Sequence, residues 1–293
     1  MDPLINGCST MKKISSIVVL LGIFLLFIII GYCAYWTRSY YGEHDYGMGN
    51  YVGAMEKFKR MAEKDYLPAS FYLGLMYYNG QGVDIDYLDA VKWYTKAAEG
   101  GHALSQNNLA LMYENAQGVP QDYVEAVKWY RKAAVQGNAT AQSNLGLMYY
   151  YGKGVPQDYK EAAGWYGEAA RQGYARAQYY LGQMNTLGQG MPQDYFKAVR
   201  CFRDAAEQGY TPAQYSLGYI YASGQGVPQN YVLAHMWYNL AGAQGDLQAA
   251  KARDWVAEKM APSQIAEAQR LAEQWKPKGK NKLTIDSIVF GVS

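Results

Sequence analysis

The chain is short of cysteine, of histidine and of net charge. Its 293 residues include three Cys and three His, and 27 basic side chains nearly balance 25 acidic ones. Only Cys201 lies outside the N-terminal 33 residues, which excludes an intramolecular disulfide in the rest of the chain. The two ends hold six of the basic and two of the acidic residues, so 21 and 23 remain between residues 38 and 275. Because this slightly acidic body is poorly suited to neutralising phosphates, we expect no nucleic-acid partner.

The common catalytic and metal-binding motifs are also missing. No H-E-x-x-H, C-x-x-C or G-x-S-x-G occurs, and His44, His102 and His235 lie in three different segments. The Gly-x-Gly-Val segments are never followed by Lys-Ser/Thr, which excludes a phosphate loop. Cys201 is interpreted as a small buried hydrophobe rather than a nucleophile. We therefore predict a protein that is not an enzyme, with no catalytic, cofactor-binding or metal-binding residues and no cofactor.

One long segment has no charge at all. Residues 14–35 are 22 uncharged, mostly apolar residues, which as a helix span about 33 Å, enough for a hydrocarbon core of about 30 Å. Lys12 and Lys13 precede them, so residues 1–13 are expected in the cytoplasm and the body beyond the inner membrane. We predict a transmembrane anchor at residues 14–36. A secretory signal that is cleaved is the alternative, and Met11 is a second candidate start.

A period of 36 residues runs through the body. Gly-Val or Gly-Met pairs begin at 82, 118, 154, 190 and 226, and Leu recurs at 73, 109, 145, 181 and 217. Tyr and Ala columns keep the same spacing, and a Trp column is interrupted only by Cys201. So many columns in register indicate a tandem repeat whose units stack on their neighbours.

Each unit has the pattern of two helices. The first carries a Leu-Gly pair, and a Gly inside a helix costs about 1 kcal/mol, which predicts that a neighbouring helix packs closely there. The second opens with Asp122 or Asp158 as N-cap, with Glu125 or Glu161 three residues on. A Gly such as Gly137 is expected to end it with positive φ. Thr211-Pro212 predicts a cap followed by proline at the first helical position.

One unit carries the complete motif A-x-x-x-L-G-x-x-Y…G-x-G-V-x-x-D…A-x-x-W…A-A-x-x-G. Its residues are Ala141, Leu145, Gly146, Tyr149, Gly152, Gly154, Val155, Asp158, Ala162, Trp165, Ala169, Ala170 and Gly173. This pattern closely resembles the Sel-one-like repeat, a relative of the tetratricopeptide repeat. The resemblance implies an all-α fold, a right-handed superhelical solenoid of antiparallel helix pairs. Ala116, Asn185 and Cys201 depart from the motif, and we expect local repacking around them.

The resemblance also divides the chain. Residues 37–65 are expected to be a linker and an N-terminal half-repeat, and residues 66–245 five 36-residue repeats. Residues 246–276 are predicted to form C-terminal capping helices. Residues 277–293 are expected to be a basic flexible tail.

In tetratricopeptide-like folds the first helix of each unit lines the concave face. We place these helices at 69–79, 105–115, 141–151, 177–187 and 213–223, which contain no Lys or Arg, so a cationic clamp for a C-terminal carboxylate is not expected. Tyr and Asn combine stacking area with adaptable hydrogen bonding. By analogy, the residues predicted to face a partner in this groove are Phe71, Tyr78, Asn107, Asn115, Ser143, Tyr150, Tyr179, Tyr215 and Tyr219.

Because members of the resembled family act mostly as adaptors, we predict a membrane-anchored scaffold that binds protein or peptide partners at the cell envelope. The same aromatic surface also suits glycan binding, to peptidoglycan or exopolysaccharide. An envelope hydrolase is a third alternative that no group of residues supports.

Overall fold

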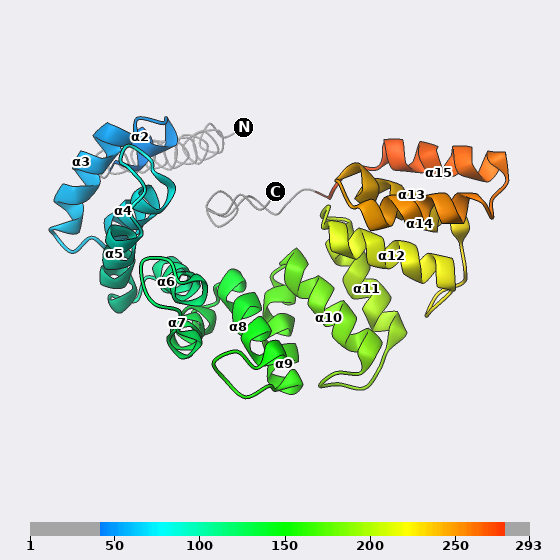
Figure 1. Ribbon diagram of the computed structural model, residues 1–293, viewed down its shortest axis with the longest axis horizontal. Helices are drawn as coiled ribbons and strands as arrows, with labels where there is room; N and C mark the ends of the chain where they lie inside the picture. Colours follow the sequence, from blue (N-terminus) through cyan, green and yellow to red (C-terminus); the bar gives the residue numbers. More distant parts are fainter. Residues whose placement is uncertain (1–41, 279–293) are drawn as a thin grey trace, which may run out of the picture. The chain divides into compact units, whose positions relative to one another are not determined.

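The computed structural model describes residues 42–278, which form fourteen α-helices and no strand (Figure 1). None of the helices in this range is long and apolar enough to cross a membrane. The predicted anchor at residues 14–36 and tail residues 279–293 lie outside the described residues. The chain divides into two compact units, residues 1–93 and 94–293, and the boundary falls within α5 (Tyr87–Glu99).

The first unit contains α2 (Glu43–Gly47), α3 (Tyr51–Ala62), α4 (Leu67–Asn79) and the start of α5. Helix α3 packs against both α2 and α4. Phe58 of α3 is fully buried, and its ring stacks on Tyr72 of α4 with centroids 4.7 Å apart. Gln81, just after α4, accepts a hydrogen bond of 2.6 Å from the Tyr46 hydroxyl. Helix α3, in the range predicted as a half-repeat, therefore shares its packed core with α4.

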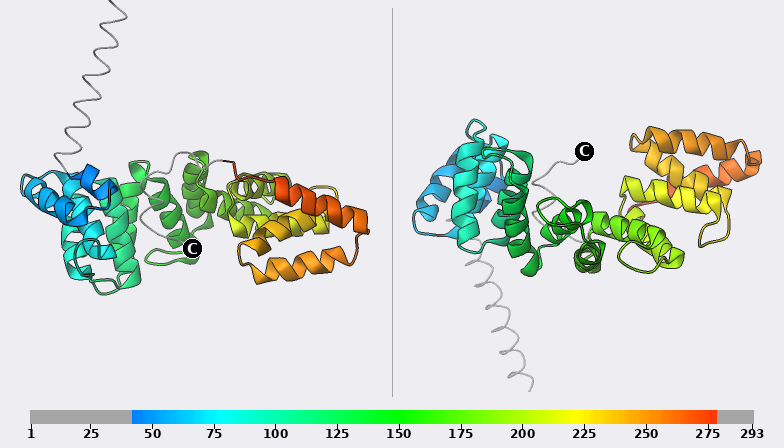
Figure 2. Two further views of the ribbon diagram at one scale, coloured as in Figure 1. Left: turned by 90° about the horizontal axis from the view of Figure 1, so that it is seen from above. Right: turned by 60° about the horizontal axis from the view of Figure 1, so that its bottom comes forward.

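The second unit contains ten helices in series, and each packs against the next as far as α14 (Figures 1 and 2). The series begins with four hairpins, each made of the first and the second helix of one repeat, and ends with two single helices. They are α6 (Ala103–Asn115) with α7 (Tyr123–Val135), α8 (Ala139–Tyr151) with α9 (Tyr159–Arg171), α10 (Ala175–Leu187) with α11 (Tyr195–Ala206), α12 (Thr211–Ser223) with α13 (Tyr231–Ala243), then α14 (Leu247–Ala257) and α15 (Pro262–Gln274). This order defines an all-helical repeat solenoid.

The glycine inside the first helix lies directly against an aromatic ring of the second. A Cβ placed on Gly146 would come within 2.9 Å of the Tyr166 ring, and one on Gly218 within 2.5 Å of the Tyr238 ring. Real Cβ atoms do not approach so closely, and tight packing of this kind is what repays the helix propensity that glycine loses. The close packing predicted from the Leu-Gly pair is confirmed.

The helix ends match the sequence at some positions and differ at others. Asp122 accepts hydrogen bonds from the backbone N–H groups of Val124 and Glu125, as predicted for an N-cap. Gly137 has a φ of 87°. Thr211 is the first residue of α12 rather than its cap, because the extended residue before it is Tyr210. Ala116 ends α6 with a φ of 57°, the left-handed conformation that Gly152 has at the end of α8, so the backbone path stays the same there and Ala116 takes the strain.

Glutamine side chains connect consecutive hairpins in a repeating pattern that the sequence analysis missed. Gln142 of α8 donates to the Ala134 carbonyl of α7 at 3.0 Å, and its own carbonyl accepts from Gln172 at 2.8 Å. The same two bonds recur one and two units further along. Gln142 is only 5% exposed, so both of its bonds satisfy buried polar atoms. These side chains fix the register of each hairpin on the preceding one.

Helix α15 does not continue the series. It packs against α13, and Figure 1 shows it beside that helix. Trp275, directly after α15, meets the Trp237 ring of α13 edge to face, with centroids 6.3 Å apart. The chain then runs to α11, where the Lys278 backbone N–H donates to the Glu207 carbonyl at 2.7 Å. The last described helix therefore covers a second helix of the repeat.

Candidate partner-binding face

The predicted groove residues fall into two groups by exposure. Phe71, Asn107 and Ser143 are 2%, 3% and 0% exposed, so none of them can contact a partner in this conformation. This part of the prediction is wrong, because the repeat position that these three residues share is buried in the first three repeats. The other six are half-buried or exposed: Tyr78, Asn115, Tyr150, Tyr179, Tyr215 and Tyr219.

The buried polar side chains form a hydrogen-bond chain across three first helices. Asn144 of α8 donates to the Asn107 side chain of α6 at 3.2 Å. Arg176 of α10 donates through Nε to the Ser143 hydroxyl at 3.2 Å and through Nη2 to the Asn144 carbonyl oxygen. Because buried polar groups are costly unless paired, this chain specifies how α6, α8 and α10 align.

Arg176 corrects the expectation that the first helices carry no cation. Helix α10 begins at Ala175, two residues earlier than the sequence analysis placed it, and so includes Arg176. Its guanidinium has five N–H donors, and two of them make the bonds to Ser143 and Asn144. Arg176 is half-buried. It is the only Lys or Arg on α6, α8, α10 and α12, and Glu114 is the only acidic residue there.

Tyrosines lie close to Arg176, whose guanidinium carbon is 5.7 Å from the centroid of the Tyr174 ring. Tyr179 lies one turn along α10, and its ring meets those of Phe202 and Tyr210 with centroids 5.8 and 5.5 Å apart. Tyr180 stacks on the buried Tyr166 at 5.2 Å. Burial raises the pKa of Tyr179, and it raises the pKa of Tyr210 to about 12. These phenols therefore stay neutral at physiological pH and act as hydrogen-bonding groups beside a fixed positive charge.

The most exposed of the predicted groove tyrosines lies on α12. Tyr219 is 50% exposed, and Tyr215, one turn before it, is half-buried against the Tyr238 ring at 5.6 Å. Tyr150 of α8 donates from its hydroxyl to the Gln189 side chain at 3.0 Å. We call Arg176, Tyr179, Tyr215 and Tyr219 the first-helix face of the second unit.

The described residues offer little for catalysis. Cys201 is half-buried, and burial raises the pKa of its thiol to about 11, so it is protonated at neutral pH. Within residues 42–278 no group of three or more His, Cys, Asp and Glu is placed to hold a metal ion. His102 caps α6 by accepting from the Ser105 backbone N–H. The Tyr166 hydroxyl is buried without a hydrogen-bond partner.

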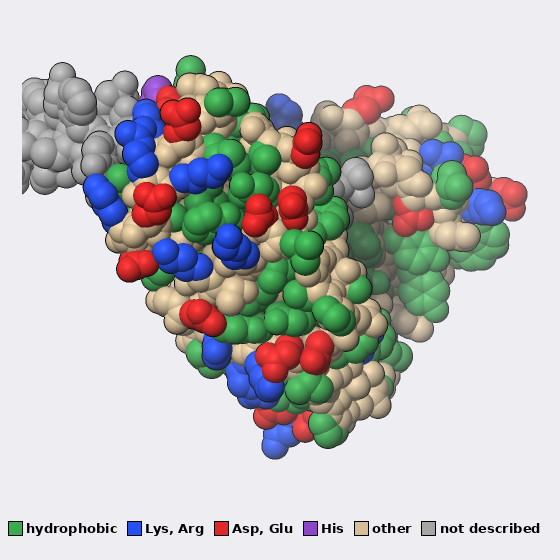
Figure 3. All heavy atoms as spheres, turned by 60° about the vertical axis from the view of Figure 1, so that its left-hand side comes forward, with side chains coloured by type: hydrophobic (Ala, Val, Ile, Leu, Met, Phe, Trp, Pro, Cys, Tyr) green, Lys and Arg blue, Asp and Glu red, His purple; other side chains and the backbone are tan. Residues whose placement is uncertain are grey.

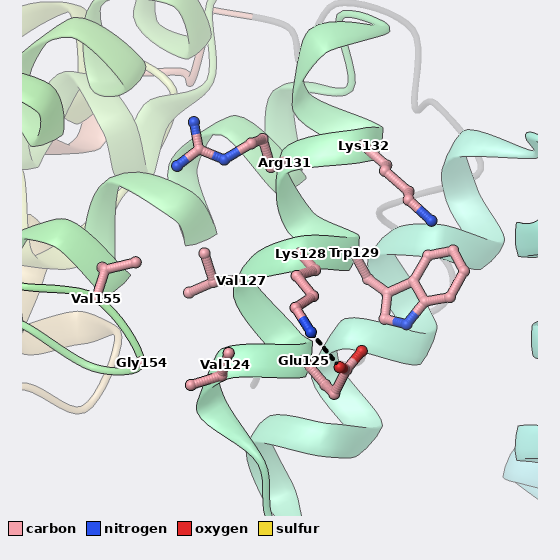
Figure 4. Close-up of a pocket in the computed structure, with 9 residues that line it drawn as sticks. All are labelled: Val124, Glu125, Val127, Lys128, Trp129, Arg131, Lys132, Gly154 and Val155. Atoms are coloured by element: carbon pink, nitrogen blue, oxygen red, sulfur yellow. Dashed lines mark hydrogen bonds and ion pairs between the residues drawn. The ribbon is translucent and has the colours of Figure 1, made fainter.

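A second surface feature lies on the second helices. A hollow of about 480 Å³ opens on α7, bordered by the loop after α8 (Figure 4). On the face of the molecule shown in Figure 3, basic and acidic side chains are intermixed with apolar ones. The residues lining the hollow are Val124, Glu125, Val127, Lys128, Trp129, Arg131, Lys132, Gly154 and Val155. The sequence analysis did not single out this hollow.

Paired helices with a 36-residue period place the protein among the tandem-repeat solenoids. A family model described as the Sel1 repeat matches five times in succession, at residues 67–102, 103–138, 139–174, 175–210 and 211–246. The matches cover more than half of the chain, which therefore belongs to the Sel1 repeat family. A comparison with curated proteins gave no match.

Two solved structures resemble the chain at more than 30% identity. One is a protective antigen present in uropathogenic Escherichia coli strains that displays an SLR fold, with 33% identity, a TM-score of 0.71 and 82% of this chain covered. This chain spans only 55% of the length of that protein. The other is a Sel1 repeat protein from Oxalobacter formigenes, with 32% identity, a TM-score of 0.71, and 83% of this chain and 97% of the other covered.

Proposed function

We propose that the protein is a non-enzymatic scaffold that binds a peptide segment of a partner protein on the first-helix face of the second unit. The proposal is supported most by one juxtaposition: the Arg176 guanidinium lies beside the Tyr174 ring, and the neighbouring first helices α8 and α12 carry no cation. Sel1 repeat proteins generally serve as scaffolds for protein–protein interactions, which agrees with this role.

The chemistry of the face suits a peptide. The guanidinium has N–H donors beyond those bonded to Ser143 and Asn144, and these can meet a peptide carbonyl or a carboxylate. Tyr179 and Tyr219 supply rigid rings that cover apolar side chains at low entropic cost. Since the polar chain below Arg176 fixes its position, the face is largely organised before a partner arrives.

The test uses the full-length chain to capture partners, identifies them, and then measures the affinity of each for variants. Tyr219→Ala is expected to weaken binding about tenfold, as for a contact residue of moderate weight. Phe196→Ala on α11 is the control, because Phe196 is an exposed aromatic ring on a second helix of the repeat. Equal affinities for the two variants and the unaltered chain would contradict the proposal.

A glycan remains the second candidate ligand, because the exposed Tyr219 ring could also stack on a sugar. A glycan array probed with the same proteins separates the two. Binding to peptidoglycan or exopolysaccharide fragments that is lost in Tyr219→Ala, without a protein partner, favours the glycan.

We further propose that residues 14–36 anchor the protein in the inner membrane, with the repeats on the outer side. The uncharged run and the preceding Lys12 and Lys13 support this topology. A reporter fused to the C-terminus should then be active only outside the cytoplasm. Activity inside the cytoplasm would reverse the assignment, and a shortened secreted product would indicate signal cleavage instead.

A further inference from the structure

The outward side of α7 and that of α13 are equivalent positions of the repeat, three units apart. Lys128, Trp129 and Lys132 of α7 correspond to Met236, Trp237 and Leu240 of α13, each 108 residues later. On α13 this side is covered: Met236 and Trp237 are both 7% exposed, and Leu240 is half-buried. On α7 both lysines are exposed and Trp129 is half-buried.

The cover on α13 is an amphipathic helix. Ala268, Leu271, Ala272 and Trp275 recur at helical spacings of three and four residues, and all are buried or half-buried. Ala272 lies in one apolar cluster with Met236 and Trp237, and Leu271, Trp275 and Leu240 pack against that cluster. The chain therefore contains an example of the element that fits this side of a second helix.

On α7 the same side is an open hollow lined by apolar and charged side chains. Figure 4 shows Val124, Val127 and Val155 on one side of α7 and the Trp129 ring on the other. Val127 is 5% exposed, whereas Val124 is 52% exposed. The volume of about 480 Å³ is within the range of ordinary ligand pockets, and here it extends along the helix.

The hollow is lined by three cations, Lys128, Arg131 and Lys132, which distinguishes it from the covered side of α13. Its one acidic side chain, Glu125, pairs with Lys128 at 2.5 Å, and Figure 4 shows this pair between the valines and Trp129. Lys132 Nζ lies 3.8 Å from the centroid of the Trp129 ring. The equivalent residues of α13 are Met236, Asn239 and Leu240, none of which is charged.

The later second helices do not repeat this set of cations. On α9 the positions of Lys128, Arg131 and Lys132 hold Gly164, Gly167 and Glu168. On α11 they hold Arg200, Arg203 and Asp204. Helix α5 does share Lys92, Trp93 and Lys96 with α7, but Thr95 takes the place of Arg131.

We infer that the hollow on α7 docks an acidic amphipathic helix of a partner protein, in the place that α15 takes on α13. An apolar stripe with i, i+3, i+4 and i+7 spacing would pack on Trp129, as α15 packs on Trp237, and acidic residues beside the stripe would pair with Lys128 and Lys132. The segment of this chain after α15 is a poor occupant, because residues 276–293 contain four Lys and a single Asp. The site is separate from the first-helix face, and it holds or fails independently of the proposed function.

The test measures binding of two labelled peptides to the full-length chain by fluorescence polarisation. One has the sequence of residues 261–276, in which Glu267 and Glu273 balance Arg270 and Lys276. The other carries Gln269→Glu and Lys276→Glu, which lie beside the apolar stripe. We expect the acidic peptide to bind at least about tenfold more tightly than the neutral one, and less tightly as salt is raised.

Two protein variants locate the binding site. Lys128→Glu with Lys132→Glu should weaken the acidic peptide at least about tenfold. Lys160→Glu with Lys251→Glu changes the net charge equally at two exposed lysines outside the hollow and should leave binding unchanged. Trp129→Ala removes the proposed apolar contact without altering charge. The inference is overturned if the acidic peptide does not bind, or if it binds both double variants equally, which would place it elsewhere, such as on α13 after displacing α15.

Discussion

Helices α7 and α13 have the same place in the repeat, and they meet solvent differently. Their inward residues agree: Ala126 and Ala234 are fully buried, and Tyr130 and Tyr238 are 0% and 3% exposed. Their outward residues diverge, because Lys128 is exposed where Met236 is buried. The repeat therefore constrains the side of each second helix that packs on its hairpin partner, and leaves the other side free to become surface or core.

The difference also shows how the series of hairpins ends. A solenoid must cover the apolar side of its last unit, or that side remains exposed to solvent. Here α14 packs on α13 in the manner of the next first helix, and α15 lies on α13 instead of pairing with α14. The terminal second helix carries Met236 and Leu240 where α7 carries lysines, which matches an apolar cover.

The two helices should differ most in stability when the same ring is removed from each. Trp237→Ala takes away an indole that is 7% exposed and in contact with Trp275, so we expect a loss of about 3–5 kcal/mol of unfolding free energy. Trp129→Ala removes a half-buried ring and should cost about 1 kcal/mol. Urea denaturation of the two variants measures both. Equal losses would show that α15 does not cover α13.

Exchanging Lys and Met between the two helices should have a smaller effect on the unfolding free energy. Met236→Lys places on α13 the residue that α7 has, and burying its ammonium beneath α15 should cost about 1–3 kcal/mol. Amide hydrogen exchange across Pro262–Gln274 should become faster as α15 opens more often. The reverse change, Lys128→Met, loses only an exposed pair with Glu125 and should stay within about 0.5 kcal/mol. Unchanged exchange in α15 after Met236→Lys would argue against a tight cover.

Much of the helical architecture was predictable because its causes are local. The 36-residue period, the N-cap at Asp122 and the glycine at 146 each reflect an interaction within one hairpin, and each was found where the sequence placed it. The position of α15 was not predictable in this way. After the last repeat no column remains to compare, and the choice between α13 and α14 depends on non-local apolar contacts.

The candidate site was predicted only in part, for two physical reasons. Placing α10 two residues late removed Arg176 from the first helices, although helix ends commonly vary by that much. Burial at one repeat position also differs from repeat to repeat: Phe71 and Ser143 are buried there, whereas Tyr179 at the equivalent position is only half-buried. A period shows which residues are equivalent, but not which are covered.

The smallest expected difference between the two helices depends on pH. His235 of α13 takes the place of Val127 of α7, is 3% exposed and has no partner for Nδ1. Burial lowers the pKa of its imidazole, and Arg253 of α14 lowers it further while Asp254 opposes this. In the unfolded chain the pKa of His235 is about 6.5. The unfolded chain therefore binds more protons than the folded one as the pH falls below that value.

Stability is then unaffected by His235 above about pH 6.5 and declines as the pH falls through that value toward the folded pKa. His235→Val gives α13 the residue of α7 and should remove this part of the decline. Unfolding free energies at about pH 7.5 and about pH 5.5 for both proteins measure it, since other titrating groups contribute equally to each. If both proteins lose the same stability on acidification, the imidazole is not held neutral by its burial beneath α14.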